Sequence, residues 1–163
     1  MKFFKQLIKP TLQEHWFADL IFAVVRFVCG MLLAIDFGAS KFGMPWTAEG
    51  QNLNLFEVSA WFPEDVAQYG GLFAIAPLFF AWMGAFSEAV GGLFLAFGLQ
   101  TRIASFLITC TMLVAIFFQQ WGEGSWKLLP AMGFLWVAIY NLYFGSGRFG
   151  LDYVISKQLK NNN

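Results

Sequence analysis

Hydrophobic positions in this chain gather into four long runs, separated by shorter stretches that hold most of the polar residues. The runs cover residues 18–37, 72–99, 103–121 and 128–144. A membrane-spanning helix needs about 20 apolar residues, within a range of about 17 to 25. Each run is therefore long enough to span a bilayer, although the last is at the short end. The pattern predicts an all-α integral membrane protein, with residues 1–163 forming one transmembrane domain built as an antiparallel four-helix bundle.

The composition supports a lipid environment. Hydrophobic residues make up 58% of the chain and charged residues 12%, against about 25% charged residues in a typical soluble domain. The formal net charge is zero, and the basic residues near the N-terminus suit a lipid surface better than a nucleic acid. We therefore expect the bilayer to be the main partner and no nucleic-acid binding.

The basic residues in the loops predict the orientation. Cytoplasmic loops of membrane proteins carry an excess of Lys and Arg. On one side of the predicted bundle lie Lys2, Lys5, Lys9, Arg102, Arg148, Lys157 and Lys160. The opposite side has only Lys41 and Lys127. Both termini are thus expected in the cytoplasm, and the long connection over residues 38–71 outside it.

The connection 38–71 is acidic and rich in aromatic residues. Apolar residues at helical spacing predict a short interfacial helix over residues 53–62. Two roles remain open for this connection. It is either an aromatic-anchored linker or a docking surface for a protein partner.

Two charged residues interrupt otherwise apolar runs. Arg26 lies in the first run and Glu88 in the second, where each charge costs roughly 2.5 to 3.5 kcal/mol even on lenient insertion scales. At about 1.5 Å per residue, Arg26 lies roughly 12 Å from Ala18 and Glu88 roughly 15 Å from Gly98. The two are level by this count, so we predict a buried Arg26–Glu88 pair, with both as candidate catalytic residues.

Small residues offer a packing surface around this pair. Gly84 and Gly92 recur with Glu88 at helical spacing, and Gly30 provides a matching gap four residues after Arg26. With Tyr140 and Asn141 of the fourth helix, these glycines form the predicted ligand-binding set. A redox role predicts a cavity between the first, second and fourth helices that opens to lipid. The alternative is that the charge pair only fixes helix register, as buried pairs can.

The residues also restrict the cofactors. His15 is the only histidine, and Cys29 and Cys110 are the only cysteines, so the chain has no ligand set for haem, an iron–sulfur cluster or zinc. No glycine-rich nucleotide loop is present. The two cysteines are either apolar fillers or, since their depths are similar, a redox pair. If electrons pass through this protein, they must come from a partner and leave on a lipid-soluble carrier, which makes a quinone the one cofactor left open.

A second polar group is expected at the outer end of the bundle. Its members are Asp36, Lys41 and Gln119. Asp36 is the member for which a function is expected, through a bond to Lys41 or Gln119. Solvation of the helix ends is the alternative explanation.

The chain resembles the DoxX family of small four-helix bacterial membrane proteins. The resemblance rests on an arginine in the first helix, a Gly-x-x-Lys at its end (Gly38 to Lys41), Glu88 followed by Gly91 and Gly92, and the boundary motif Gly98, Thr101 and Arg102. It extends to a glycine-rich ending that includes Arg148 and Asp152. The resemblance implies a bacterial inner (plasma) membrane protein related to the membrane partner of thiosulfate:quinone oxidoreductase.

Local roles are expected for the motif residues as well. Arg102 can bind lipid phosphate or cap the carbonyls that end the second helix, and Arg148 and Asp152 can form a local pair. In many relatives a histidine takes the place of Gln119 or Gln120.

Three functions follow in order of preference. The first is a membrane subunit that links a sulfur compound or another small reductant to the quinone pool, with no enzymatic activity assigned to this chain alone. The second is a non-catalytic scaffold or assembly factor that docks a partner through residues 38–71. The third is a small-solute or proton conductor, which ranks last because the third helix has few polar residues. The sequence leaves the oligomeric state, the partner and the electron donor open.

Overall fold

The structure is a computed structural model that describes residues 10–47 and 49–161. The described residues are mostly helical and contain no β-strand beyond the isolated bridge between Phe42 and Val58. The predicted basic residues Lys2, Lys5 and Lys9 lie outside the described part of the chain.

Within residues 10–47 and 49–161, four helices are long and apolar enough to cross a membrane. The first is α2 (Trp16–Leu32), continued without a break by the π-helical segment η1 (Leu33–Gly38). The second is α5 (Pro77–Phe97). The third is α6 (Thr101–Val114) with the π-helical segment η2 (Ala115–Gln120), and the fourth is α7 (Ser125–Phe144). The all-α membrane fold predicted from the hydrophobic runs is confirmed.

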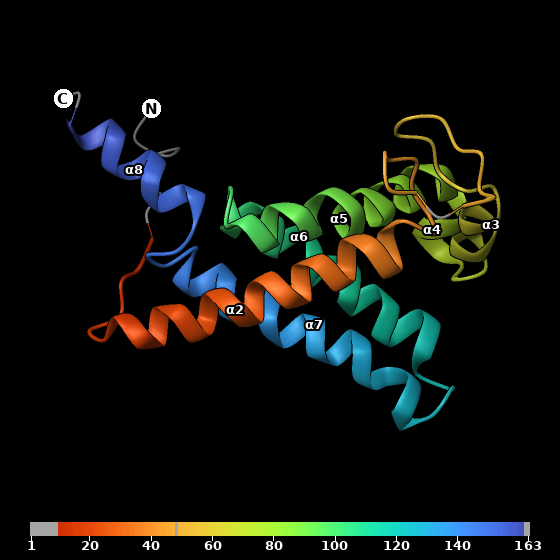
Figure 1. Cartoon of the computed structure of the whole chain (residues 1–163). Coiled ribbons are helices and arrows are strands. Elements are labelled where there is room, and N and C mark those ends of the chain that lie inside the picture. The colour runs from red at the N-terminus through yellow and green to blue at the C-terminus, as the bar shows by residue number, and fades with distance from the viewer. Residues whose placement is uncertain (1–9, 48, 162–163) are drawn as a thin grey trace.

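Three shorter helices of the described residues lie outside these spans. The outer connection forms α3 (Trp61–Ala67) and α4 (Gly71–Ile75), and α8 (Leu151–Asn161) ends the described chain. Figure 1 shows α2 crossing the molecule from the end where α8 lies to the end where α3 and α4 lie. The helix predicted over residues 53–62 is wrong, because the backbone turns through positive φ at Phe56 and becomes helical only at Trp61.

Proline positions explain two boundaries that the sequence placed differently. The residue before a proline avoids the helical region, and Ala76 before Pro77 has φ −137° and ψ 58°. The predicted helix 72–99 is therefore broken into α4 and α5. The last hydrophobic run predicts a helix from residue 128, but α7 begins at Ser125, so Pro130 lies inside it.

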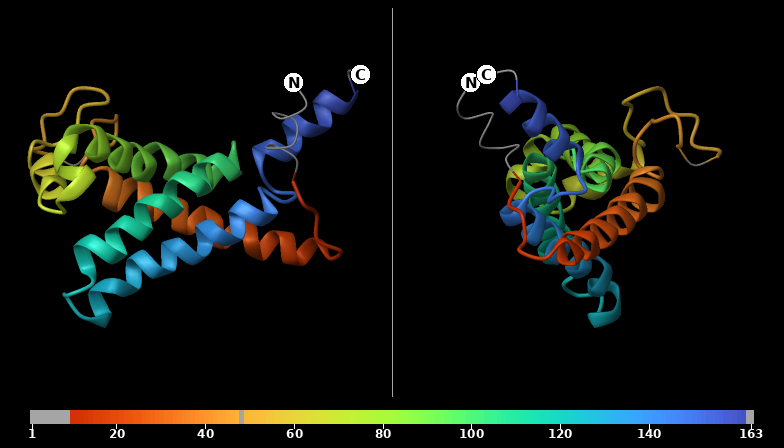
Figure 2. Two further views of the ribbon diagram at one scale, coloured as in Figure 1. Left: turned by 180° about the vertical axis from the view of Figure 1, so that it is seen from behind. Right: turned by 60° about the vertical axis from the view of Figure 1, so that its left-hand side comes forward.

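Two apolar clusters hold the helices together. One lies between η1, α5, α6 and α7 and includes Leu33, Leu95, Ile108, Met112 and Leu135. The other joins α5 to the outer connection and includes Phe42, Phe62, Val66, Ala81 and Ala85. Figure 2 shows α6 and α7 side by side, diverging from α5 toward the turn that joins them. The second cluster fixes α3 against α5, which shapes the site described below.

The seam between α2 and α5 is built from small residues. A Cβ atom on Gly30 would lie 2.5 Å from the Gly92 oxygen and 2.6 Å from the Ala96 nitrogen. A Cβ atom on Gly38 would lie 2.5 Å from the Cα of Ala89. Close backbone approach through small residues is the usual way that helices associate in lipid. The predicted gap at Gly30 and Gly92 is thus confirmed.

This seam gives a stability prediction. Gly30→Ala is expected to lower the free energy of unfolding by about 1–3 kcal/mol, because the added methyl group overpacks a backbone contact. Gly133→Ala is the matched control, since a Cβ atom there would meet nothing within 4 Å. Thermal unfolding in detergent measures both. Equal unfolding temperatures for the two variants would contradict the close seam.

Candidate functional site

A cavity of about 320 Å³ gathers several polar groups within the spans. It lies between α5 and α6 at the end of the molecule that carries α3 and α4. Its lining comes from Lys41, α3, α4 with the residues just before it, the first three turns of α5, and α6 with η2. The cavity predicted between the first, second and fourth spans is therefore replaced by one between the second and third.

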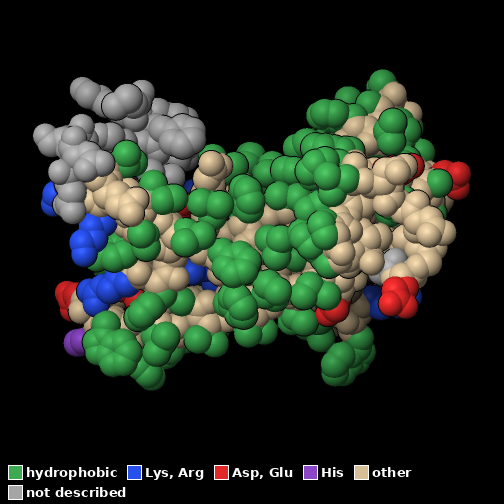
Figure 3. Space-filling model, turned by 45° about the horizontal axis from the view of Figure 1, so that its top comes forward, with side chains coloured by type: hydrophobic (Ala, Val, Ile, Leu, Met, Phe, Trp, Pro, Cys, Tyr) green, Lys and Arg blue, Asp and Glu red, His purple; other side chains and the backbone are tan. Residues whose placement is uncertain are grey.

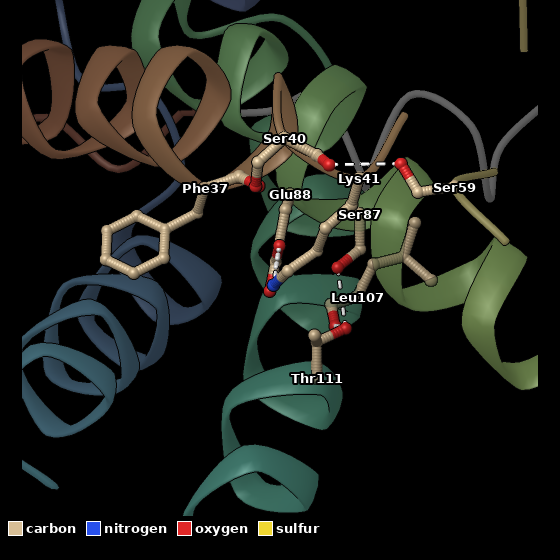
Figure 4. Close-up of polar contacts among 8 residues, drawn as sticks. All are labelled: Phe37, Ser40, Lys41, Ser59, Ser87, Glu88, Leu107 and Thr111. Carbon is tan, nitrogen blue, oxygen red and sulfur yellow. Dashed lines mark hydrogen bonds and ion pairs between the residues drawn. The ribbon is translucent and has the colours of Figure 1, made fainter. Parts of the chain in front are cut away.

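A buried ion pair forms the polar end of the cavity. The Lys41 Nζ atom lies 2.6 Å from Oε2 of Glu88, and the two side chains are only 13% and 5% exposed. Figure 4 shows the lysine side chain reaching from the loop to the carboxylate on α5. The ammonium also lies 5.0 Å from the centre of the Phe62 ring, a cation–π contact. Lys41, and not Arg26, is thus the partner of Glu88.

The position of Lys41 follows from the glycine three residues before it. Gly38 ends η1 and packs directly on the backbone of Ala89, the neighbour of Glu88. The chain then turns, with the Lys41 and Phe42 amides donating to the Gly38 carbonyl at 3.1 and 3.0 Å. Since the turn starts against α5, the lysine stem needs only to fold back to reach Glu88.

Hydroxyl groups lie beside the ion pair. The hydroxyls of Ser87 and Thr111 are 2.6 Å apart and join α5 to α6 (Figure 4). The Cys110 thiol lines the same cavity and is free, as is Cys29, which is not among the lining residues. The structure therefore gives no support to a disulfide between the two cysteines.

Aromatic side chains form most of the remaining wall. They are Phe62, Tyr69, Phe73, Phe79, Phe80 and Phe106. Burial, helped by the charges of Asp65 and Glu88, raises the pKa of the Tyr69 phenol above its ordinary value. The phenol therefore stays protonated at neutral pH, as a hydroxyl that can donate to a ligand.

The cavity reaches the surface that faces lipid. Phe79 on α5 is 60% exposed and Phe106 on α6 is 56% exposed, and both line the cavity. These residues belong to spans whose exposed faces are apolar. A ligand could therefore enter sideways from the bilayer between α5 and α6.

Arg26 lies at the opposite end of the bundle. Its guanidinium donates to the backbone oxygens of Ser146 at 2.5 Å and Phe149 at 3.2 Å. A Cβ atom on Gly98 would lie 2.8 Å from the Arg26 Nη2 atom. Arg26 is therefore level with the end of α5, so the predicted Arg26–Glu88 pair is wrong. The buried arginine fixes the loop between α7 and α8.

The glycine-rich ending forms a cap for the third span. The Asp152 carboxylate, 1% exposed, accepts hydrogen bonds from the Gln100 amide at 2.7 Å and from the Thr101 amide and hydroxyl, both at 2.9 Å. These groups begin α6, whose first N–H groups need acceptors. Arg148 pairs with Asp19 at 3.1 Å, so the predicted pair of Arg148 with Asp152 is also wrong.

Arg102 does not cap the carbonyls that end α5, which was one of the two roles expected of it. The Arg102 guanidinium donates to the backbone carbonyl oxygen of Tyr143, at the end of α7, at 3.2 Å. The carbonyls that end α5 are satisfied by the backbone, because Gly98 adopts φ +67° and its amide and that of Leu99 bond to Leu95 and Phe94. This is the Schellman motif, which glycine favours.

The remaining predicted residues divide between the two ends. Tyr140 and Asn141 lie near Arg26 in a small cavity and are not among the residues that line the Glu88 site. Gly84 and Gln119 line the Glu88 cavity, whereas a Cβ atom on Gly91 would face Ile108 at an ordinary 3.7 Å. Asp36 is exposed. The predicted bond between Asp36 and Lys41 is not formed, because Lys41 bonds to Glu88.

Some site residues were not predicted. Phe62, Tyr69, Ser87 and Thr111 were missed because their types are common in any membrane helix or interfacial loop. The Gly-x-x-Lys spacing and the outer polar group both indicated Lys41, but neither paired it with Glu88. That pairing depends on the contact of Gly38 with Ala89.

Comparison with known families adds an independent observation. Residues 50–121 match the DoxX family model. The match supports membership of the DoxX family. The DoxX match contains the connection that leads into α3, the whole of α5, and α6 with η2, and so includes most of the cavity wall and Glu88. No curated protein and no solved structure is significantly similar to the chain.

The DoxX match and the four apolar helices together describe a multi-pass membrane protein. DoxX proteins are often tied to oxidoreductase-related functions. Lys41 lies before the matched residues, and Arg26, Arg148 and Asp152 lie outside them as well.

Proposed function

We propose that this protein is the membrane subunit of an oxidoreductase system that passes electrons from a small reductant, such as a reduced sulfur compound, to a membrane quinone. The observation that carries the proposal is the apolar cavity with the Lys41–Glu88 pair at its polar end. Its volume of about 320 Å³ is at the lower end of the range of about 300–1,000 Å³ that is usual for small-molecule sites.

The lining suits a quinone ring. A quinone combines a flat apolar ring with two carbonyl oxygens, and the cavity combines aromatic walls with a few donors. Lys41 can donate a hydrogen bond to one carbonyl, and the protonated Tyr69 phenol lies on the same wall. A long isoprenoid tail would leave through the opening between α5 and α6, beside the exposed Phe79 and Phe106.

Reduction of a quinone to a quinol adds two electrons and two protons. In this proposal the electrons come from a reduced donor held by a partner protein. Glu88 is the proton relay, because intramembrane carboxylates commonly serve in proton transfer. Lys41, which is bonded to Glu88, polarises the quinone carbonyl.

The site lies at the end of the bundle that carries the connection 39–60. With both termini in the cytoplasm of a bacterial cell, as the basic residues predict, this end faces away from the cytoplasm. Figure 3 shows Lys and Arg side chains gathered at the other end, with hydrophobic side chains over most of the surface between. The donor protein would then dock on the outer face.

The same outer face supports a second candidate, a scaffold without redox chemistry. Leu55, Phe56 and Trp61 are 62%, 48% and 41% exposed there. Exposed apolar side chains outside the spans are typical of docking surfaces. Both candidates need a protein partner, but only the first needs a ligand beside Glu88.

Quinone retention distinguishes the two candidates. Wild type, Glu88→Gln and the control Asp36→Asn are purified from the same membranes, and the extracted quinone is quantified against an unrelated membrane protein in matched lipid. Glutamine keeps the shape and an oxygen that Lys41 can bond to. We expect Glu88→Gln to lose about tenfold in retention, because the charge-assisted bond that holds Lys41 beside the cavity becomes a weaker bond to a neutral oxygen. A factor of ten corresponds to about 1.4 kcal/mol.

The control has no contact with the cavity, because Asp36 is exposed and is not a lining residue. It should retain quinone like the wild type. Background quinone in all three proteins would refute the redox proposal and favour the scaffold.

A further inference from the structure

A second hollow lies at the end of the molecule opposite the proposed quinone site. It is a groove of about 480 Å³ between α2, the end of α5 and the start of α8. Six large apolar side chains line it and are each 45–54% exposed. They are Val24, Phe27, Phe97, Phe149, Leu151 and Val154.

Helix α8 brings an amphipathic surface to this groove. Leu151 and Val154 line the groove, three residues apart on one face, while Lys157 and Lys160 are exposed further along the helix. The helix is held in place by the buried Asp152, whose amide also donates to the Gly98 oxygen at 2.9 Å. An amphipathic helix with basic residues on its polar side is typical of a membrane–water interface.

The polar end of the groove is basic. Arg26 and Arg148 both line it. Arg26 is 2% exposed, and its Nε atom has no hydrogen-bond partner among the residues that the structure describes. A buried polar atom without a partner normally requires an explanation, such as a missing ligand or water.

The nearby acidic residues do not cancel this charge at the surface. Asp19 and Asp152 are 3% and 1% exposed. Asp19 pairs with Arg148, and Asp152 accepts the hydrogen bonds at the start of α6. The Arg148 side chain remains 32% exposed, and Lys157 is exposed too. The accessible charge around the groove is therefore positive.

We propose that this groove binds one anionic phospholipid of the bilayer. The phosphate lies beside Arg148 and toward Lys157, and an acyl chain follows Val24, Phe27 and Phe97 down the spans. Basic side chains next to a span attract anionic lipid headgroups by about 1 kcal/mol each. The proposal is independent of quinone binding, because the two hollows share no lining residue.

Native mass spectrometry of the full-length protein in detergent tests the assignment. Phosphatidylglycerol, phosphatidylcholine with the same acyl chains, and glycerol phosphate are each titrated into delipidated protein. Val24→Trp places a large side chain in the groove without touching the charges. Val28→Trp is the matched control, since Val28 is 48% exposed on the same helix but does not line the groove.

We expect wild type and Val28→Trp to retain one phosphatidylglycerol at concentrations where phosphatidylcholine dissociates. Val24→Trp is expected to bind it about tenfold more weakly, because the acyl chain loses its contacts with the groove. Equal retention of the two lipids would overturn the proposal. So would equal binding by the two tryptophan variants, or glycerol phosphate binding as tightly as the lipid.

Discussion

Asp152→Ala is expected to lower the free energy of unfolding by about 3–5 kcal/mol, the range seen when one partner of a buried charged network is removed. The variant loses three hydrogen bonds at 2.7–2.9 Å from Gln100 and Thr101. It also leaves the positive charge of Arg26 without the carboxylate that interacts with it. Gln100 has φ +43°, a conformation that non-glycine residues seldom adopt, so the start of α6 depends on this acceptor.

Thermal and denaturant unfolding in detergent measure the effect. Asp36→Ala is the control, because Asp36 is an exposed carboxylate and surface substitutions usually stay within about 0.5 kcal/mol. A similar stability for the two variants would mean that α6 does not need the Asp152 cap.

Lys41→Met is the second substitution with a large expected effect. It leaves Glu88, whose side chain is 5% exposed, without its ammonium partner. A stranded buried charge is expected to cost about 3–5 kcal/mol. The double variant Lys41→Met with Glu88→Leu removes both charges and is expected to recover most of this loss, because apolar replacements of a buried pair are often neutral.

An exposed ion pair elsewhere in the chain provides the control for the loss of stability in Lys41→Met. Lys127 and Glu123 form an ion pair whose side chains are 66% and 52% exposed, and surface pairs contribute about 0–1 kcal/mol. Lys127→Met should therefore leave the unfolding temperature nearly unchanged. If the double variant at Lys41 and Glu88 is as unstable as Lys41→Met, the ion pair is not the cause of the loss.

The fold could be predicted from the sequence because its signals are long and repeated. The four hydrophobic runs correspond to the four spanning helices, with ends displaced by a few residues. The small-residue seam was also predictable, since Gly30 and Gly92 interrupt otherwise bulky runs and only a close helix contact explains both. The second run was predicted as one helix over 72–99, whereas the structure divides it before Pro77 into α4 and α5.

The partner of Glu88 could not be predicted because helix register was unknown. Counting depth from Ala18 and Gly98 assumed that these two residues lie level. In the structure Gly98 lies against Arg26 and Ala89 lies against Gly38. Arg26, and not Ala18, therefore lies level with Gly98. This difference is eight residues along the first span, or roughly 12 Å at about 1.5 Å per residue.

The two π-helical segments could not be predicted from the sequence either. Segment η1 ends at Gly38, and η2 places Gln119 at the cavity. Wider helical turns of this kind often occur at functional sites, but no residue type marks them. The site thus depends on local backbone geometry and on one glycine contact, whereas the fold depends on hydrophobic periodicity.

The central claim is that a quinone ring occupies the cavity between α5 and α6 beside Glu88. Photolabelling tests it most directly: a quinone that carries an azide on its ring is irradiated with the protein in bilayer nanodiscs, and the labelled peptides are identified by mass spectrometry. We predict labels on the α5 and α6 segments that line the cavity, near Met83 and Cys110, and their suppression by excess unlabelled quinone. Labels spread evenly over the lipid-facing surface, or unaffected by that competitor, would contradict the claim.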